Sequence, residues 1–209
     1  MPFKMKNIPY LFLVTISLLI LSCGEDPKSD PPTTTAKESK IAKKTDQQKL
    51  SKKYNFNFSD TQSRSLPLHI QNHIYNFSNI AEPIVLVNFF ATWCPPCRGE
   101  LPHLNNLQKS YKKQLSILGL LIDDDISPQE LDLFITSQKI NYTIASNQGE
   151  NQRFAKFIAP KLRLKADFDI PLMILFVQGR YYTHYMGTVP EEMIESDIKQ
   201  ALNKIKGQQ

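Results

Sequence analysis

Two segments of this chain are almost continuously apolar, residues 83–90 and residues 115–122. Such runs are typical of strands that are buried on both faces of a sheet. Other segments alternate apolar and polar positions, which predicts strands with one exposed face. These segments predict two hairpins, one turned at Gln71-Asn72 between residues 66–70 and 73–77, the other turned at Gln178-Gly179-Arg180 between residues 171–177 and 181–186.

Apolar residues at helical spacing lie between and after these strands. A helix is expected from the cysteine motif at residue 94 to about residue 113. Ser127-Pro128-Gln129-Glu130 predicts another helix start, because Ser is a good N-cap, Pro suits the first turn and Glu completes a capping box. Residues 140–146 predict a short strand, and residues 151–164 a helix as far as Pro160. The last expected element is an amphipathic helix over residues 191–205, with its inward face formed by Met193, Ile194, Ile198, Ala201, Leu202 and Ile205.

This order of elements predicts the fold class. Strands alternate with helices, and a hairpin and a helix close the chain, which is typical of an α/β or α+β sandwich built around a mixed sheet.

The N-terminus has the pattern of an export signal. Lys4 and Lys6 precede an apolar run over residues 10–21, which is shorter than the roughly 20 residues of a membrane-spanning helix. The run ends in Ile20-Leu21-Ser22-Cys23-Gly24, which resembles the lipobox of bacterial lipoproteins, although Leu21 is larger than usual there. Residues 1–22 are therefore expected to be a lipoprotein signal peptide, and Cys23 the lipidated residue. The alternative is a short uncleaved anchor, and either arrangement puts the rest of the chain outside the cytoplasm.

Residues 23–53 are expected to form a flexible, lipid-anchored tether. They are rich in Lys, Ser, Thr, Asp and Pro and have no sustained apolar stripe, so they cannot bury enough surface to offset the entropy of ordering. The alternative is a partial helix over residues 36–53 held near a surface. Residues 54–209 then form one folded domain.

Composition agrees with a folded domain and argues against nucleic acid as a partner. Hydrophobic residues make up 41% of the chain and charged residues 22%, with a formal net charge of +5. The first two values are ordinary for a globular protein, and the charge is too mild for a nucleic-acid-binding one. The chain has three cysteines. Lipidation of Cys23 would leave Cys94 and Cys97 as the redox-active pair.

The candidate chemistry lies in Trp93-Cys94-Pro95-Pro96-Cys97. The motif follows a buried strand and opens a helix, so Cys94 is expected at a helix N-terminus, where the macrodipole favours a thiolate. The thiolate is the attacking species in disulfide exchange. Cys97 lies one helical turn further on, close enough to bridge to Cys94 and resolve a mixed disulfide.

Three other interpretations of the cysteine pair are weaker. A purely structural disulfide would close a very small loop and add little constraint. A zinc site would need a second pair of ligands, and the four histidines are scattered along the chain. An inactive scaffold kept only for binding has no need of two intact cysteines. We therefore expect no metal and no cofactor apart from the Cys94–Cys97 disulfide.

Residues 85–102, which read Val-Leu-Val-Asn-Phe-Phe-Ala-Thr-Trp-Cys-Pro-Pro-Cys-Arg-Gly-Glu-Leu-Pro, resemble the TlpA/ResA/CcmG branch of the thioredoxin superfamily. Members of this branch are exported, membrane-tethered disulfide reductases. The resemblance implies a thioredoxin-like fold, with a central mixed β-sheet flanked by helices, an N-terminal β-hairpin and a central insertion placed at residues 140–169.

The resemblance also implies roles for residues around the motif. Cys94 matches the nucleophile, Cys97 the resolving cysteine, and Trp93 the tryptophan that packs beside the pair. Glu100 matches an acidic residue near the active site that accepts or relays the proton of the buried thiol. The alternative for Glu100 is an ordinary exposed helix glutamate. Pro102 is expected to kink the helix, as in the family.

Three further positions complete the expected site. Asn88 stands where cytoplasmic thioredoxins have a buried aspartate. Pro171 matches the cis-proline that faces the cysteines in this fold, and Ile170 would offer backbone groups to an extended client segment. Leu172 departs from the threonine that the branch often has there, and the first hairpin lacks the usual glycine, which leaves the choice of client open.

The two intervening prolines bear on the direction of electron flow. Pro95 and Pro96 have no backbone N–H, so a Cys94 thiolate receives fewer hydrogen bonds and the reduced form is less stable. We therefore expect a membrane-tethered, extracytoplasmic reductase of client disulfides, re-reduced by a membrane thiol donor. The resemblance makes apocytochrome c, in cytochrome c maturation, the expected client. The alternatives are a disulfide oxidase or isomerase and a redox-regulated binding lipoprotein.

Overall fold

The computed structural model describes residues 52–207. The predicted signal peptide, Cys23 and all but the end of the predicted tether lie outside the described residues. Among residues 52–207, no helix is long and apolar enough to cross a membrane.

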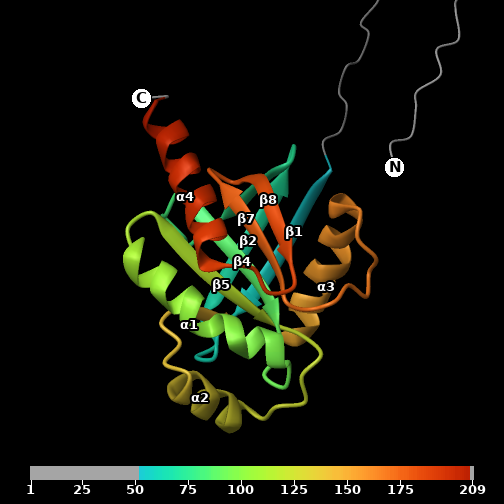
Figure 1. Cartoon of the computed structure of the whole chain (residues 1–209). Helices are drawn as coiled ribbons and strands as arrows, with labels where there is room; N and C mark the ends of the chain where they lie inside the picture. Colours follow the sequence, from blue (N-terminus) through green and yellow to red (C-terminus); the bar gives the residue numbers. More distant parts are fainter. Residues whose placement is uncertain (1–51, 208–209) are drawn as a thin grey trace, which may run out of the picture. The chain divides into compact units, whose positions relative to one another are not determined.

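A five-stranded mixed sheet forms the centre of the fold (Figure 1). Its strand order is β6-β5-β4-β7-β8, with β4, β5 and β6 parallel and with β7 antiparallel to both of its neighbours. The strands are β4 (Ile84–Phe90), β5 (Leu115–Leu121), β6 (Thr143–Ala145), β7 (Leu172–Val177) and β8 (Arg180–Met186). Every residue of β4 is buried, which confirms the prediction from the first apolar run.

A second, three-stranded antiparallel sheet packs on one face of the central sheet. It consists of β1 (Lys53–Ser59), β2 (Ser65–Gln71) and β3 (Ile74–Phe77) in the order β1-β2-β3. Its apolar side chains share a buried cluster with those of β4 and β7, such as Phe56 and Phe89. The β2–β3 hairpin was predicted, but β1 was not, because its alternation begins at the polar end of the predicted tether.

The β2–β3 hairpin turns one residue later than the sequence predicted, at Asn72-His73. Both residues have positive φ angles, 51° and 62°. Two-residue hairpin loops favour this geometry because it matches the twist of the strands, and Asn tolerates it without a glycine.

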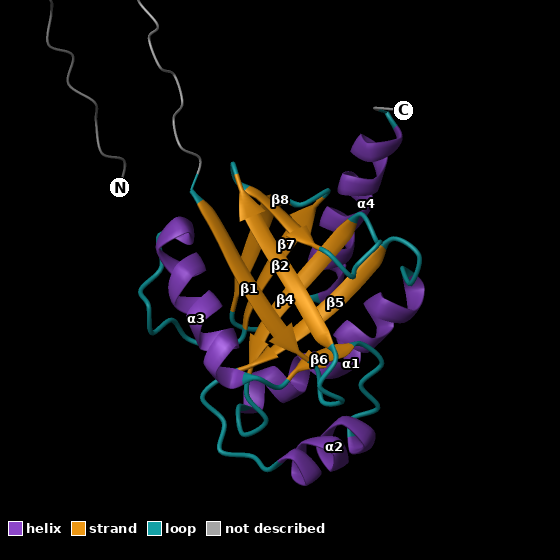
Figure 2. Ribbon diagram, turned by 180° about the vertical axis from the view of Figure 1, so that it is seen from behind, coloured by secondary structure: helices purple, strands orange, loops and turns teal. Residues whose placement is uncertain are grey.

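Helices complete both faces of the central sheet (Figure 2). Helices α1 (Pro95–Ser110) and α4 (Glu191–Lys206) pack on one face, and α3 (Gln148–Ile158) packs with β1 and β2 on the other. Helix α2 (Pro128–Ser137) begins at Ser127 with the predicted capping box, and α3 leads into a short 3-10 helix over Ala159–Leu162. The segment expected to be the central insertion contains β6, α3 and this 3-10 turn.

Several predicted boundaries and one predicted core residue are wrong. Helix α1 ends at Ser110, β6 is shorter than residues 140–146, and α3 begins three residues early, capped by the side chain of Asn147. Met193 was predicted to face inward but is 50% exposed, because the buried stripe of α4 runs through Ile194, Ile198 and Ala201.

Candidate active site

A disulfide bond joins Cys94 and Cys97 at the start of α1. Strand β4 delivers the chain to this point through a short loop, and Cys94 is the N-cap residue of the helix. Both cysteines are buried, with relative exposures of 2% and 1%. They pack in a small apolar cluster with Phe90, Leu121 and Leu131. The site therefore lies between the end of β4 and the positive end of the α1 dipole.

The helix start offers the sulfur of Cys94 one backbone hydrogen bond. The N–H of Cys97 donates to Cys94 Sγ at 3.3 Å. Pro95 and Pro96 occupy the first two helical positions and have no N–H to donate. The sulfur of Cys94 therefore has few backbone N–H donors at this helix start, as the two prolines predicted.

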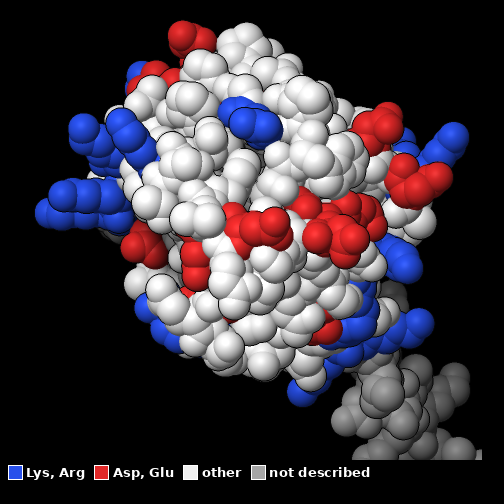
Figure 3. Space-filling view, turned by 90° about the horizontal axis from the view of Figure 1, so that it is seen from below, with Lys and Arg blue, Asp and Glu red and all other residues white. Residues whose placement is uncertain are grey.

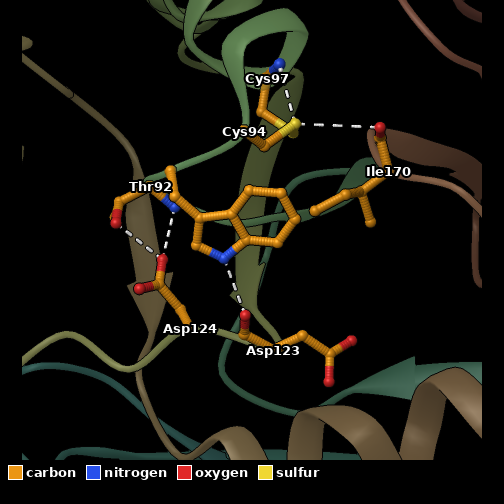
Figure 4. The surroundings of a disulfide bond; sticks show 7 residues. Thr92, Cys94, Cys97, Asp123, Asp124 and Ile170 are labelled. Atoms are coloured by element: carbon orange, nitrogen blue, oxygen red, sulfur yellow. Dashed lines mark hydrogen bonds between the residues drawn. A yellow bond between two sulfur atoms is a disulfide. The ribbon is translucent and has the colours of Figure 1, made fainter.

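The peptide bond between Ile170 and Pro171 is cis, as the resemblance implied. Pro171 directly precedes β7, which pairs with β4, and this brings the bond to the cysteine pair. Cys94 Sγ lies 3.8 Å from the carbonyl oxygen of Ile170 (Figure 4). A backbone acceptor therefore stands beside the expected nucleophile.

Hydrogen bonds join the active-site loop to the loop that follows β5. The backbone N–H and the hydroxyl of Thr92 both donate to Asp124 Oδ2, the hydroxyl at 2.7 Å (Figure 4). The indole Nε1–H of Trp93 donates to the carbonyl oxygen of Asp123 at 2.8 Å, while 60% of Trp93 stays exposed. Sequence reasoning missed Thr92, Asp123 and Asp124, because their contacts join residues about 30 positions apart along the chain.

Acidic side chains gather near the middle of the face that is seen from below, with Lys and Arg mostly around its margin (Figure 3). The loop Asp123-Asp124-Asp125 beside Trp93 contributes acidic groups next to the cysteine motif. The surroundings of the site therefore contain more negative charge than the overall net charge of +5 indicates.

Glu100 is buried, with a relative exposure of 2%, which excludes the alternative of an ordinary exposed helix residue. Its Oε1 accepts a hydrogen bond from the backbone N–H of Val189 at 3.2 Å. Burial raises the pKa of Glu100 to about 7, although the Val189 N–H and the nearby His103 act in the opposite direction. A carboxyl group with this pKa can both take up and release a proton near neutral pH.

Asn88 is fully buried on β4. Within the described residues, neither its Nδ2 nor its Oδ1 has a hydrogen-bond partner. It lies on the side of the sheet that α1 covers, because it shares a strand face with Leu86, which packs against α1 residues. In residues 52–207, no group of three or more His, Cys, Asp or Glu side chains is arranged to hold a metal ion.

A family model described as the AhpC/TSA family matches residues 56–161, about half of the chain. This chain belongs to the AhpC/TSA family. The matched segment contains Asn88, Cys94, Cys97 and Glu100, and it ends before Ile170 and Pro171. Within this AhpC/TSA chain, the cysteine motif and the buried glutamate thus lie in the segment that matches the family model.

Curated relatives of this AhpC/TSA chain include the thioredoxin-like protein YneN of Bacillus subtilis, which is 50% identical over 119 residues, 54% of this chain and 62% of the relative. The thiol-disulfide oxidoreductase ResA of Oceanobacillus iheyensis is 27% identical over 86 residues, 41% of this chain and 44% of the relative. The chain thus spans about half the length of the curated relatives it matches.

Solved structures show that the AhpC/TSA chain has a thioredoxin-like fold. A thiol:disulfide interchange protein of the thioredoxin family from Chlorobium tepidum TLS superposes with a TM-score of 0.55 at 20% identity, covering 71% of this chain and 93% of that one. A putative thiol:disulfide interchange protein DsbE from Chlorobium tepidum gives a TM-score of 0.53 at 21% identity, with 71% and 94% covered.

Proposed function

We propose that this protein is a thiol–disulfide oxidoreductase that reduces disulfide bonds in client proteins. The main support for this proposal is the position of Cys94 Sγ, at the N-cap of α1 and 3.8 Å from the Ile170 carbonyl oxygen. A nucleophilic sulfur beside a backbone acceptor suits attack on a disulfide in an extended segment. The names of the relatives YneN and ResA agree with this chemistry.

The reduced pair would act in two exchange steps. The Cys94 thiolate attacks one sulfur of the client disulfide, a Cys94–client bond forms, and the other client sulfur leaves as a thiolate that takes up a proton. Cys97, as a thiolate, then attacks Cys94 Sγ. The Cys94–client bond breaks with its electron pair on the client sulfur, and the Cys94–Cys97 disulfide forms. The client gains two electrons, and the protein ends with the Cys94–Cys97 disulfide that the structure contains.

Glu100 is proposed to take the proton from the Cys97 thiol in the second step. Residues three positions apart lie on the same side of a helix, so Glu100 and Cys97 are neighbours on α1. Because burial raises the pKa of Glu100 to about 7, its carboxylate is basic enough to act on a thiol. Trp93 and Pro171 are proposed to shape the client groove on either side of Cys94, and the backbone of Ile170 to contact the client.

The site is proposed to work outside the cytoplasm, held to a bacterial membrane by lipid on Cys23. The support is the lipobox-like sequence at residues 20–24 and the composition of the segment that follows. A thiol donor in the membrane would return electrons to the Cys94–Cys97 disulfide, and apocytochrome c is the proposed client. Labelling with radioactive palmitate should mark the full chain and not a Cys23→Ala variant.

A trapping experiment tests the exchange chemistry and identifies the client together. In a Cys97→Ala variant of the full chain, clients should accumulate on Cys94 as disulfide-linked adducts that dithiothreitol releases. Cys94→Ala is the matched control and should yield no adducts. Failure of Cys97→Ala to form any dithiothreitol-sensitive adduct would rule out the exchange mechanism.

A further inference from the structure

In residues 52–207, three side chains between α1 and the central sheet bury polar atoms that have no hydrogen-bond partner. Within residues 52–207, five buried side-chain nitrogen or oxygen atoms lack one, and four of the five belong to Asn88, Glu100 and Tyr142. They are Nδ2 and Oδ1 of Asn88, Oε2 of Glu100 and the hydroxyl of Tyr142. Unpartnered polar atoms are uncommon in protein interiors because they lose their hydration, so a concentration of them calls for an explanation.

The packing of β4 against α1 brings Asn88 and Glu100 together. Asn88 lies on its strand between Leu86 and Phe90, and the three side chains point to the same side of the sheet. Phe90 shares a buried cluster with Cys97, one turn before Glu100 on α1. Leu86 shares another with Leu104, one turn after Glu100. Glu100 is itself buried on this helix face. It therefore lies over the part of β4 that carries Asn88.

Tyr142 reaches the same region from the loop that directly precedes β6, the strand on the other side of β5. Asn88 pairs with Gly119 of β5, so both residues point to the same side of the sheet. A Cβ atom at Gly119 would lie 3.4 Å from Cε2 of Tyr142, so one edge of the tyrosine ring lies beside this glycine. Burial and the negative charge of Glu100 both raise the pKa of Tyr142, so its hydroxyl stays protonated and able to donate.

We propose that Tyr142 and Asn88 hold a buried water molecule that donates to Oε2 of Glu100, and that Tyr142 is thereby a positioning residue which stabilises the ionised form of Glu100. A single water that accepts from the Tyr142 hydroxyl and from Nδ2 of Asn88 and donates to Oε2 of Glu100 would satisfy three of these four atoms, as buried waters commonly do. The consequence for client release rests on the proposed function above. The coupling between Tyr142 and Glu100 does not depend on it.

The other polar groups around Glu100 already have partners. The backbone N–H of Val189 donates to Oε1 of Glu100. Cys94 and Cys97 carry no charge while they form the disulfide. Two pairs of titratable side chains on α1, β8 and α4 bind one another: His103 of α1 with Glu191 of α4, and Tyr185 of β8 with Asp197 of α4. Within residues 52–207, the buried hydroxyl of Tyr142 has no partner and so remains available to Glu100.

A direct titration of Glu100 tests this coupling without any client. The full chain, oxidised and in detergent, is labelled with 13C at the glutamate carboxyl carbons and titrated by NMR, with Glu100 assigned by its loss in Glu100→Gln. Burial, the Val189 N–H and His103 together put the pKa at about 7, so the additional bond from the water should bring the wild-type midpoint below 7. Tyr142→Phe should raise it by about 1 pH unit, because a hydrogen bond that favours the carboxylate is lost.

Tyr111→Phe is the matched control, because Tyr111 also packs against the α1 side of the sheet but its hydroxyl donates to Glu195 at 2.9 Å. It should leave the Glu100 midpoint unchanged. An unchanged or lowered midpoint in a folded Tyr142→Phe variant, or an equal rise in Tyr111→Phe, overturns the proposal. Asn88→Leu gives a second test, since it removes the other proposed ligand of the water and should also raise the midpoint.

The pH dependence of client release separates this inference from the proposed function. Tyr142→Phe should move the midpoint of the rate profile upward together with the NMR midpoint, and it should have no effect in a Glu100→Gln background. If the NMR midpoint moves and the rate profile does not, the coupling stands and the role of Glu100 in client release is wrong.

Discussion

The sulfur of Cys94 lies 3.8 Å from the carbonyl oxygen of Ile170, although the two residues are 76 positions apart in the chain. Pairing of β4 with β7 creates this proximity, because the strand that ends before Cys94 lies beside the strand that begins after Pro171. The arrangement joins a nucleophile to a backbone acceptor for an extended client segment.

Restoring a backbone donor at Pro96 should make the protein more oxidising. An N-cap side chain accepts hydrogen bonds from the second and third helical positions, so Pro96→Ala adds an N–H that can reach Cys94 Sγ. A hydrogen bond to a charged group contributes about 1.5 kcal/mol, and in this two-electron couple ~1.4 kcal/mol corresponds to about 30 mV. The reduction potential should therefore rise by about 30 mV in glutathione equilibration.

Pro95→Ala is the control for this experiment. It removes a proline at the first helical position, whose N–H points away from the N-cap side chain. Equal potentials for the two variants would show that hydrogen bonding at Cys94 does not set the potential.

Replacing Glu100 should stabilise the oxidised protein at alkaline pH. Because the pKa of Glu100 is about 7 in the fold and 4.5 when unfolded, the native state binds more protons between these values, and stability falls as pH rises through them. The shift corresponds to about 3 kcal/mol. Urea unfolding should therefore find Glu100→Gln more stable than wild type at pH 8, with the advantage shrinking towards pH 4. An advantage that is the same at both pH values contradicts the assigned cause.

Two glycines near the site should respond oppositely to alanine. At Gly119 a Cβ would lie 2.6 Å from Ile144 Cδ1 and 3.1 Å from Phe90 Cε1, so Gly119→Ala overpacks the core and should destabilise by about 1–3 kcal/mol. At Gly99 a Cβ meets nothing within 4 Å, so Gly99→Ala should stabilise α1 by up to about 1 kcal/mol. The melting temperatures of the two variants check this prediction. A shift of both in the same direction would contradict the packing described around Gly119 and Gly99.

Features that depend on neighbouring residues could be predicted from the sequence. The apolar run of β4, the capping box at Ser127 and the position of Cys94 at a helix start all follow from neighbouring residues, and the structure contains them. The resemblance supplied the cis bond before Pro171 and directed attention to Glu100. These two depend on tertiary structure, and residue spacing alone does not predict them.

What the sequence did not predict arises from long-range packing. The contacts of Thr92 and Trp93 with the Asp123-Asp124 loop depend on how β4 and β5 pair. The close approach of Ile144 to β5 depends on the absence of a side chain at Gly119. The outward position of Met193 follows from the rotation of α4, which a broad apolar face in the sequence does not fix.

The reduction potential of the Cys94–Cys97 pair tests the central claim most directly. The full chain is equilibrated with defined thiol–disulfide buffers, and the fraction of free thiols is measured by alkylation and mass spectrometry. A reductase should have a potential close to that of thioredoxin, about −270 mV. A potential close to that of DsbA, about −120 mV, would mean that this protein oxidises its clients and would contradict the account.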